Sequence, residues 1–72
     1  MTLSLSVNGV IQNLDPAPDP ACIDTVVRAL GHNPALVVVE HNGAIVPRGK
    51  WTAQLVVNDD QLEIVTIVGG GS

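Results

Sequence analysis

The chain has 72 residues, a length that fits one domain and excludes folds built from separate nucleotide and substrate domains. Hydrophobic residues make up 46% of it and charged residues only 14%, a balance that excludes a disordered tail. Seven acidic residues against three basic ones give a formal net charge of −4, which disfavours nucleic acid and anionic membranes as partners and favours proteins with basic docking surfaces.

The first predicted element is a β-hairpin. Leucine or valine alternates with serine over residues 3–7, a period of two that is typical of a half-buried strand. Asn8-Gly9 follows, and this dipeptide favours a tight turn because both turn positions need a positive φ. Residues 10–14 are therefore expected to return as the second strand. Three prolines at alternate positions then exclude regular structure over residues 15–20.

A short helix is predicted next, with Asp19 as its N-cap and Pro20 at its first position, where a missing N–H costs nothing. Gly31 is placed to end the helix in the left-handed conformation. One apolar face is formed by residues spaced i, i+3, i+4 and i+7, which are Ile23, Val26, Val27 and Leu30. A helix this short is not stable alone, so its apolar face is expected to pack on a sheet.

The second half of the chain holds further apolar segments separated by turns. Residues 36–39 form a continuous apolar run, which predicts a strand buried on both faces. Asn42-Gly43 predicts a second tight turn, and residues 44–46 are strand-like until a proline interrupts them. Residues 47–51 are predicted to form a tight turn or one helical turn.

A short strand at residues 54–57, an acidic turn at residues 58–60 and a final strand at residues 61–68 complete the predicted elements. The final strand is the longest and mostly β-branched, so we place it centrally. This order predicts an α+β fold of the ubiquitin-like β-grasp class. In that fold one short helix packs on one face of a mixed four- to five-stranded sheet, and the last strand lies parallel to the first. An open four-stranded sheet with one helix is the main alternative.

Three glycines directly follow the final predicted strand. We expect a β-grasp domain over residues 1–68 and a flexible glycine tail over residues 69–72. Such a tail is either a frayed terminus or a segment that enters a narrow channel, since glycine permits close backbone approach and almost any φ and ψ. It is not a phosphate-binding loop, because such a loop leads into a helix.

Other residues offer little catalytic or metal-binding chemistry. His32 and His41 have no ligand spacing with Cys22, so structural or surface roles are expected for them. A single cysteine cannot form an internal disulfide, and Cys22 is expected to be a buried, reduced thiol in a cytoplasmic protein. The N-terminus lacks the positive charge of a signal peptide, and no apolar run approaches the roughly 18 residues of a membrane span.

Carboxylates gather near the turn before the final strand. Asp59, Asp60 and Glu63 form either a solvated face or part of an acidic docking surface. A catalytic use is disfavoured, because a domain of this size seldom has the cleft that shifts the pKa of a carboxylate. A nucleophilic serine is also unsupported, since no motif positions a base for Ser72.

A more specific pattern begins at the second Asn-Gly turn. The sequence NGAIVPRGKW at residues 42–51 resembles the N-x-x-I-V-P-R-x-x-W segment of the sulfur-carrier proteins of thiamine biosynthesis, the ThiS family. The acidic turn and strand at residues 58–64 and the glycine ending at residues 67–71 are also similar to that family. The resemblance extends from Leu36 to Gly71 in sequence, and over the N-terminal half in element order and length.

The resemblance implies a β-grasp carrier that is not itself an enzyme and binds no cofactor of its own. An E1-like partner would adenylate the terminal glycine carboxylate with ATP. A sulfur donor protein would then form a thiocarboxylate, which delivers sulfur to thiazole synthase. Carried over, Gly71 bears the acyl group, while Gly69 and Gly70 thread the partner's site. The family ends on glycine, so Ser72 is a departure. It is removed before activation, has been added to the natural sequence, or marks a variant that carries no sulfur.

Two other functions stay open at this point. One is the sulfur carrier of another pathway, the small subunit of molybdopterin synthase, whose family also ends in Gly-Gly but lacks the proline-arginine-x-x-tryptophan segment. The other is a passive β-grasp binding module whose glycine tail is incidental. Within the matched segment, Trp51 is expected to fill the core and Pro47 to start a turn, while Arg48 and Lys50 are solvated charges or docking contacts.

Overall fold

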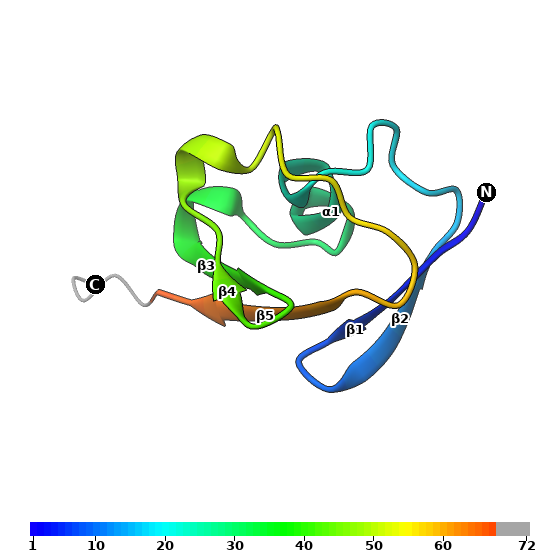
Figure 1. Ribbon diagram of the computed structural model, residues 1–72, viewed down its shortest axis with the longest axis horizontal. Coiled ribbons are helices and arrows are strands. Elements are labelled where there is room, and N and C mark those ends of the chain that lie inside the picture. Colours follow the sequence, from blue (N-terminus) through cyan, green and yellow to red (C-terminus); the bar gives the residue numbers. More distant parts are fainter. Residues whose placement is uncertain (68–72) are drawn as a thin grey trace.

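The structure is a computed structural model that describes residues 1–67. Five strands, one α-helix and two short 3-10 helices make up this part of the chain (Figure 1). In chain order they are β1 (Leu3–Val7), β2 (Val10–Leu14), α1 (Ile23–Ala29), η1 (Pro34–Leu36), β3 (Val37–His41), β4 (Ala44–Ile45), η2 (Arg48–Lys50) and β5 (Gln61–Thr66). None of these helices is long and apolar enough to cross a membrane.

The strands form one mixed sheet in the order β2-β1-β5-β3-β4. β1 and β5 are parallel and pair over only two positions, whereas β1–β2, β3–β4 and β3–β5 are antiparallel. The last strand therefore lies at the centre of the sheet, between the first and the third, as predicted. This order, with one helix on one face, is the β-grasp arrangement, and the open four-stranded alternative is wrong.

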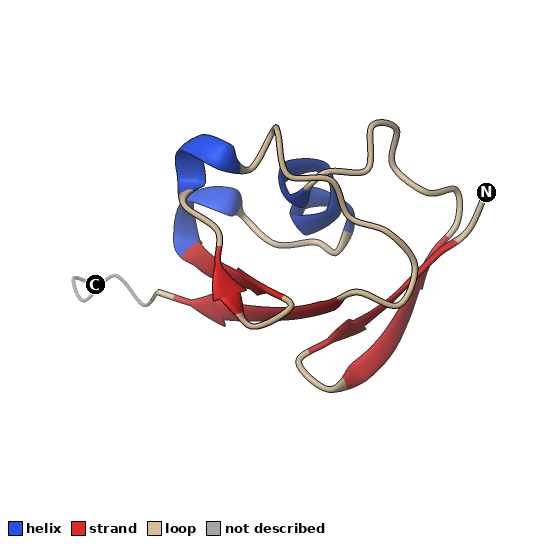
Figure 2. Ribbon diagram, in the orientation of Figure 1, coloured by secondary structure: helices blue, strands red, loops and turns tan. Residues whose placement is uncertain are grey.

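The sheet is one layer, and α1 and both 3-10 helices lie on the same side of it (Figure 2). Alternate residues of β1, β3 and β5 face this side and are buried with the predicted apolar face of α1. Trp51 completes this core with 3% of its surface exposed, and its Nε1 donates a hydrogen bond to the carbonyl of Val46 at 2.9 Å. The strand residues of the core are Leu3, Leu5, Val7, Val37, Val39, Leu62 and Ile64.

The start of the helix differs from the prediction. α1 begins at Ile23, and Cys22 is its N-cap residue in an extended conformation. The predicted start, with Asp19 as the cap and Pro20 as the first helical residue, is therefore wrong. The predicted end is confirmed, since Gly31 follows the helix with a φ of +90°.

Pairing with a distant segment explains the late start of α1. Residues 21–23 make backbone contacts with residues 54–56, and these contacts keep Ala21 and Cys22 out of the helix, so that Ile23 is its first residue. These contacts are hydrogen bonds from Val56 to Ala21 at 2.8 Å and from Ile23 to Gln54 at 3.0 Å, and an isolated antiparallel bridge between Cys22 and Leu55. The predicted strand at residues 54–57 is accordingly wrong, because its partner turns into a helix after one bridge.

Two other predicted strands need correction. The run at residues 36–39 is a strand only from Val37, because Leu36 ends the 3-10 helix η1. It is also buried on one face and not on both, since α1 covers only one side of the sheet and leaves Val38 half-buried. The final strand ends at Thr66, earlier than the predicted residue 68.

Candidate functional site

The predicted sulfur-bearing residue, Gly71, and the predicted threading residues, Gly69 and Gly70, lie outside the described residues. The structure does place the point from which they extend. β5 is the central strand, and beyond its end the amide of Ile67 donates a hydrogen bond to the carbonyl of Leu36 at 2.6 Å. The last described residue is therefore fixed against the start of β3, at the end of the molecule that carries β3 and β4 (Figure 1).

Apolar side chains surround this exit point on the sheet face that no helix covers. Directly paired residues of antiparallel strands point to the same face, so Val38 of β3 lies beside Val65 of β5 there. Val65 is 57% exposed and Ile67, two residues further on, is 48% exposed. Ile45 of β4 is 65% exposed and lines a shallow hollow together with Val38. We call Val38, Ile45, Val65 and Ile67 the outer-face patch.

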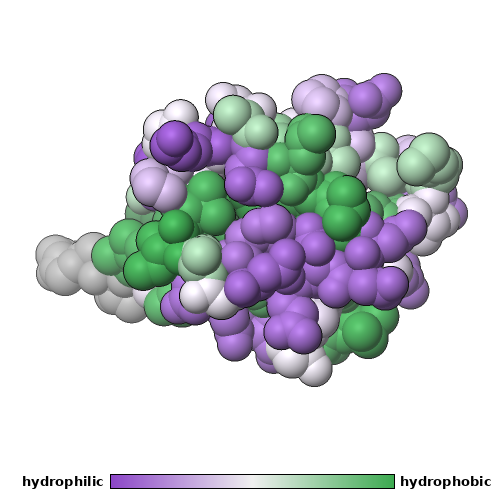
Figure 3. Space-filling view, viewed as in Figure 1, coloured by the Kyte–Doolittle hydropathy of each residue, from purple (hydrophilic) through white to green (hydrophobic). Residues whose placement is uncertain are grey.

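The space-filling view shows hydrophobic surface gathered at this same end of the molecule, over β3 and β4 (Figure 3). Single exposed apolar residues are normal on protein surfaces, but a contiguous group of them marks a site of contact. The outer-face patch is such a group, and it includes Ile67, the last residue that the structure describes.

Two carboxylates lie next to the outer-face patch on the same face. Glu40 of β3 and Glu63 of β5 are directly paired, two pairs further along the same two strands than Val38 and Val65. Like charges placed opposite each other destabilise a sheet. Neither carboxylate belongs to an ion pair within residues 1–67. We call these two residues the acidic pair. Glu63 was a predicted docking residue, whereas Glu40 was not, because the sequence alone does not reveal the register of β3 against β5.

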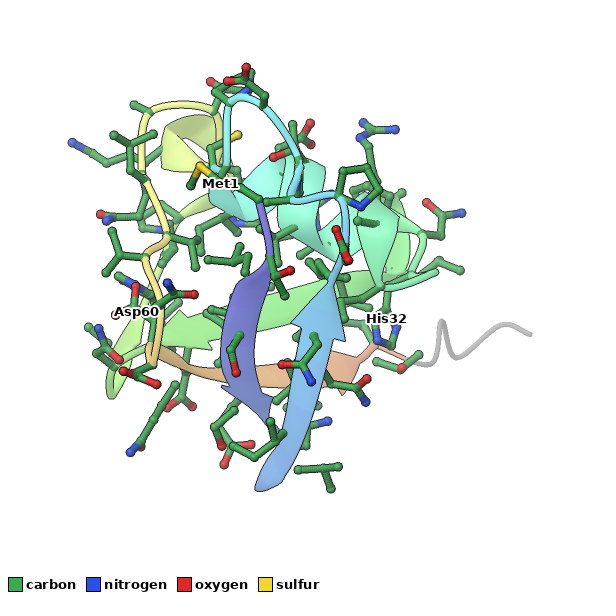
Figure 4. The ribbon with its side chains drawn as sticks, turned by 90° about the vertical axis from the view of Figure 1, so that its right-hand side faces the viewer. Met1, His32 and Asp60 are labelled. Carbon is green, nitrogen blue, oxygen red and sulfur yellow. The ribbon has the colours of Figure 1, made fainter. Side chains whose placement is uncertain are left out.

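The other two predicted acidic docking residues have different surroundings. Asp59 is exposed in the turn before β5, with a φ of +72°. Asp60 lies at the entry to β5, on the side of the molecule away from His32 (Figure 4). Its Oδ2 contacts Nε2 of His41 at 2.7 Å, and its Oδ1 accepts a hydrogen bond from Asn42 at 3.1 Å. Asp60 thus connects the loop before β5 to the β3–β4 turn.

The pKa of Asp60 reflects these contacts. Partial burial raises the pKa, but hydrogen bonds from the amide of Val57 and the side chains of His41 and Asn42, together with the charge of His41, outweigh burial and hold it below its ordinary value of 3.8. Asp60 is therefore a charged residue with a clear structural task. Asp59 and Glu63 are exposed, whereas Asp60 is half-buried and hydrogen-bonded. The three predicted docking carboxylates therefore do not share one environment.

Arg48, the remaining predicted docking residue, also makes contacts inside the molecule. Its Nη2 donates a hydrogen bond to the carbonyl of Val37 at 3.0 Å. Its guanidinium lies 4.8 Å from the ring centroid of Trp51, a distance at which a cation–π attraction operates. Residues 47–51, the proline-arginine-x-x-tryptophan segment, therefore hold η2 in contact with β3 and with the core.

The remaining candidate side chains do not form a reactive cluster. Cys22 is buried at the start of α1, as predicted, and His32 lies beyond the end of that helix. Within residues 1–67 no three or more His, Cys, Asp or Glu side chains are placed to hold a metal ion. Within residues 1–67, the prominent features at this end of the sheet are thus the outer-face patch and the acidic pair, whose two carboxylates form no ion pair.

Comparison with known proteins adds to this geometry. The ThiS family matches residues 5–71 of this chain. A solved structure, the thiamine biosynthesis protein ThiS from Geobacter metallireducens, superimposes with a TM-score of 0.78 at 30% sequence identity. It covers 96% of this chain and 100% of the other.

Longer proteins are similar as well. Thiazole synthases from Magnetococcus marinus and Paramagnetospirillum magneticum are 33% identical over 69 residues and 38% identical over 71 residues. These matches include 96% and 97% of this chain but only 20% and 21% of the synthases, so the chain spans about a fifth of their length. With a family match that runs through nearly all of its residues, the chain belongs to the ThiS family.

Proposed function

We propose that this protein is a sulfur carrier for thiazole formation in thiamine biosynthesis, with Gly71 as the residue that bears the sulfur. The observation that carries the proposal is the family match, which runs from β1 through the glycines to residue 71. The similarity to part of two thiazole synthases supports the same pathway over that of molybdopterin synthase. In this proposal the chemistry occurs in partner enzymes, and the carrier supplies a folded body and a tail without side chains.

The proposed reaction begins with the carboxylate of Gly71. A carboxylate is a poor electrophile until one of its oxygens becomes a good leaving group. An E1-like adenylating enzyme supplies that group from ATP: the carboxylate attacks the α-phosphate, pyrophosphate leaves, and an acyl-adenylate forms. A sulfide equivalent from a sulfur donor protein then displaces AMP and leaves a thiocarboxylate, whose sulfur is the nucleophile in thiazole synthase. The carboxylate of Gly71 must be free for this reaction, so residue 72 has to be absent at that step.

The test uses two forms of the protein, one ending at Gly71 and one that retains Ser72. Each is incubated with an E1-like adenylating enzyme, ATP and a sulfur donor, and the intact mass is measured. The form ending at Gly71 should gain the mass difference between one sulfur and one oxygen, while the form with Ser72 stays unchanged. If the form ending at Gly71 is never adenylated, the proposed function is wrong.

A substitution in the tail sharpens this test. Gly71→Ala, in the form ending at residue 71, adds a methyl group where a narrow channel has no room for one. We expect slower adenylation and an almost unchanged melting temperature, because residue 71 follows the last strand of the core. Adenylation at the normal rate would contradict the threading role of the glycines.

A further inference from the structure

We infer that β2 is an edge through which this protein associates with a second copy of itself. The two β2 strands pair antiparallel about a two-fold axis at Gln12, and the two sheets become one continuous sheet. The inference goes beyond the proposed function, because neither the tail nor its chemistry takes part in it.

The two edges of the sheet differ in how well they are protected against pairing. Proteins protect edge strands by making them very short or by placing charges or proline in them. The edge strand β4 has only two residues, and Pro47 follows it closely. The other edge strand, β2, has five residues from Val10 to Leu14 and contains neither a charge nor a proline (Figure 1). β2 is therefore the unprotected edge.

The hydrogen bonds of β1 show which backbone groups of β2 are free. The amide of Ser6 in β1 donates to the carbonyl of Asp60 at 3.0 Å, so Ser6 directs its backbone groups toward the β5 side and away from β2. Its partner in the hairpin register, Ile11, then forms a pair without hydrogen bonds and directs its own N–H and C=O outward. Because this direction alternates along a strand, Asn13 also faces outward.

These outward residues match each other when two copies meet. A two-fold axis at Gln12 places Ile11 of each copy opposite Asn13 of the other. Residues in a hydrogen-bonded antiparallel pair exchange both bonds, so the two pairs together supply about four hydrogen bonds. The same register places Asp15 opposite Gly9, and no two carboxylates meet across the axis.

The dimer also covers apolar surface that the monomer leaves exposed. Val10 lies on the same face as its buried partner Val7, yet it is 58% exposed because α1 does not cover this end of β2. Pairing about Gln12 brings Leu14 of the second copy opposite Val10. We expect a weak, reversible dimer, since two short strands bury less than the roughly 1,200 Å² typical of stable complexes.

The sheet order keeps this edge apart from the candidate functional site. β2 and β4 are the two ends of the order β2-β1-β5-β3-β4, and Ile67 is bonded beside the start of β3 (Figure 1). Ile67 of each copy therefore lies across the sheet from the shared edge. A dimer built through β2 leaves the outer-face patch of both copies open.

The first arm of the test measures association of the full chain. Sedimentation equilibrium between about 10 μM and 1 mM should show a monomer–dimer equilibrium. Added salt should lower the dissociation constant, because it screens the repulsion between two copies with a net charge of −4 each. In a sample that mixes two isotope labels, NMR contacts between copies should join Ile11 to Asn13 and Val10 to Leu14. These contacts determine both the direction and the register of the pairing.

The second arm compares one proline on each edge strand. Asn13→Pro removes an outward amide from β2 and leaves the hydrogen bonds to β1 in place. Ile45→Pro is the matched control on β4: the amide of Val46 donates to the carbonyl of Val39 at 3.0 Å, so Ile45 directs its own amide outward. Asn13→Pro should raise the dissociation constant of the dimer at least about tenfold, and Ile45→Pro should change it less than about twofold.

A second pair of variants does not depend on tolerance of proline. Ile11 and Ile45 are 66% and 65% exposed on the two edge strands, so Ile11→Lys and Ile45→Lys make the same change at matched exposure. Lysine on an edge strand opposes pairing with another chain. Ile11→Lys should therefore weaken the dimer, whereas Ile45→Lys should not. The melting temperature of each variant checks that the monomer is folded.

Each outcome decides for or against the shared edge. A dimer with the expected NMR contacts, weakened by the β2 variants and not by the β4 variants, supports the inference. A monomer at all concentrations up to about 1 mM, or equal effects of the β2 and β4 variants, would overturn it. If the chain stays monomeric while added thiazole synthase protects the amides of Ile11 and Asn13 from hydrogen exchange, the edge binds a different protein and the inference is wrong. None of these measurements requires adenylation, so the proposed function is tested separately.

Discussion

The two hairpins of this protein use the same dipeptide to different effect. Asn8-Gly9 and Asn42-Gly43 both form tight turns, and both asparagines have a positive φ, 52° for Asn8 and 50° for Asn42. Both also extend their side chains to the central strand, β5, which lies between the two hairpins. They differ in the contacts that the asparagine side chain makes: that of Asn8 bonds to the backbone of β5 alone, whereas that of Asn42 also bonds to the side chain of Asp60.

Asn8 acts as an additional peptide unit in the sheet. Its Oδ1 accepts a hydrogen bond from the amide of Ile64 at 2.7 Å, and its Nδ2 donates to the carbonyl of Ile64 at 3.1 Å. β1 and β5 pair over only two positions, so this side chain prolongs the parallel ladder after β1 has turned away. The contact is partly buried, and water does not readily replace it.

Asn42 instead forms part of an exposed polar network. Its Oδ1 accepts a hydrogen bond from the amide of Gln61 at 2.8 Å, and its Nδ2 donates to Asp60. β3 and β5 already pair over five positions, so the sheet does not depend on this side chain for its register. The same Asn-Gly turn sequence can therefore contribute very differently to the free energy of unfolding, depending on what the asparagine side chain contacts.

The largest expected effect is at the first turn. Asn8→Gly keeps the positive φ but leaves the amide and carbonyl of Ile64 without partners in a partly buried place. We expect a loss of about 2 kcal/mol in the free energy of unfolding, measured by chemical denaturation. A loss below that of the corresponding change at the second turn would break the comparison.

The corresponding change at the second turn should cost less. Asn42→Gly also retains the turn, and water can replace the exposed contacts to Gln61 and Asp60. We expect a loss of about 0.5–1 kcal/mol in the same denaturation experiment. Because both variants replace asparagine by glycine in an Asn-Gly turn, the difference between them isolates the asparagine contacts to β5.

The smallest expected effect depends on pH and is confined to the second turn. Since the pKa of Asp60 is lower in the folded protein than its ordinary value of 3.8, its contribution to stability is present above that value and is lost as the pH falls through the folded pKa. Asp60→Asn should therefore flatten the dependence of unfolding free energy on pH below about 4. Asn8→Gly should leave that dependence unchanged, and an equal flattening in both variants would contradict the assignment.

The sequence predicted features that depend on neighbouring residues. Both hairpin turns, the apolar face of α1 and its end at Gly31 follow from local spacing and from the conformations that Asn and Gly accept. The central position of β5 followed from its length and β-branched composition. In contrast, the predicted start of α1 was wrong, because a bridge between Cys22 and Leu55, which are far apart in the chain, overrides the local capping signal.

The residues of the candidate site also fall into two groups: those that a local sequence pattern predicts and those that depend on contacts between distant segments. Gly71 was predicted from its resemblance to a contiguous family motif, and it stays a prediction because it lies outside the described residues. The acidic pair required the register of β3 against β5, and the link from Asn8 to Ile64 joins residues 56 positions apart, so no local pattern announces either. Arg48 was predicted to be a solvated charge or a docking contact, and only the structure revealed that its guanidinium contacts the ring of Trp51 and the carbonyl of Val37.

The central position of the last strand has a consequence for biosynthesis. The ribosome synthesises the chain from the N-terminus, so β5 emerges last. Until then the β1–β2 and β3–β4 hairpins share no sheet contact, because β5 lies between β1 and β3. Leu62 and Ile64 of the core and Glu63 and Val65 of the outer face arrive together with that strand. A nascent or truncated chain that lacks β5 therefore has neither a complete core nor a complete outer-face patch. Both are completed in the same step, once synthesis has passed residue 66.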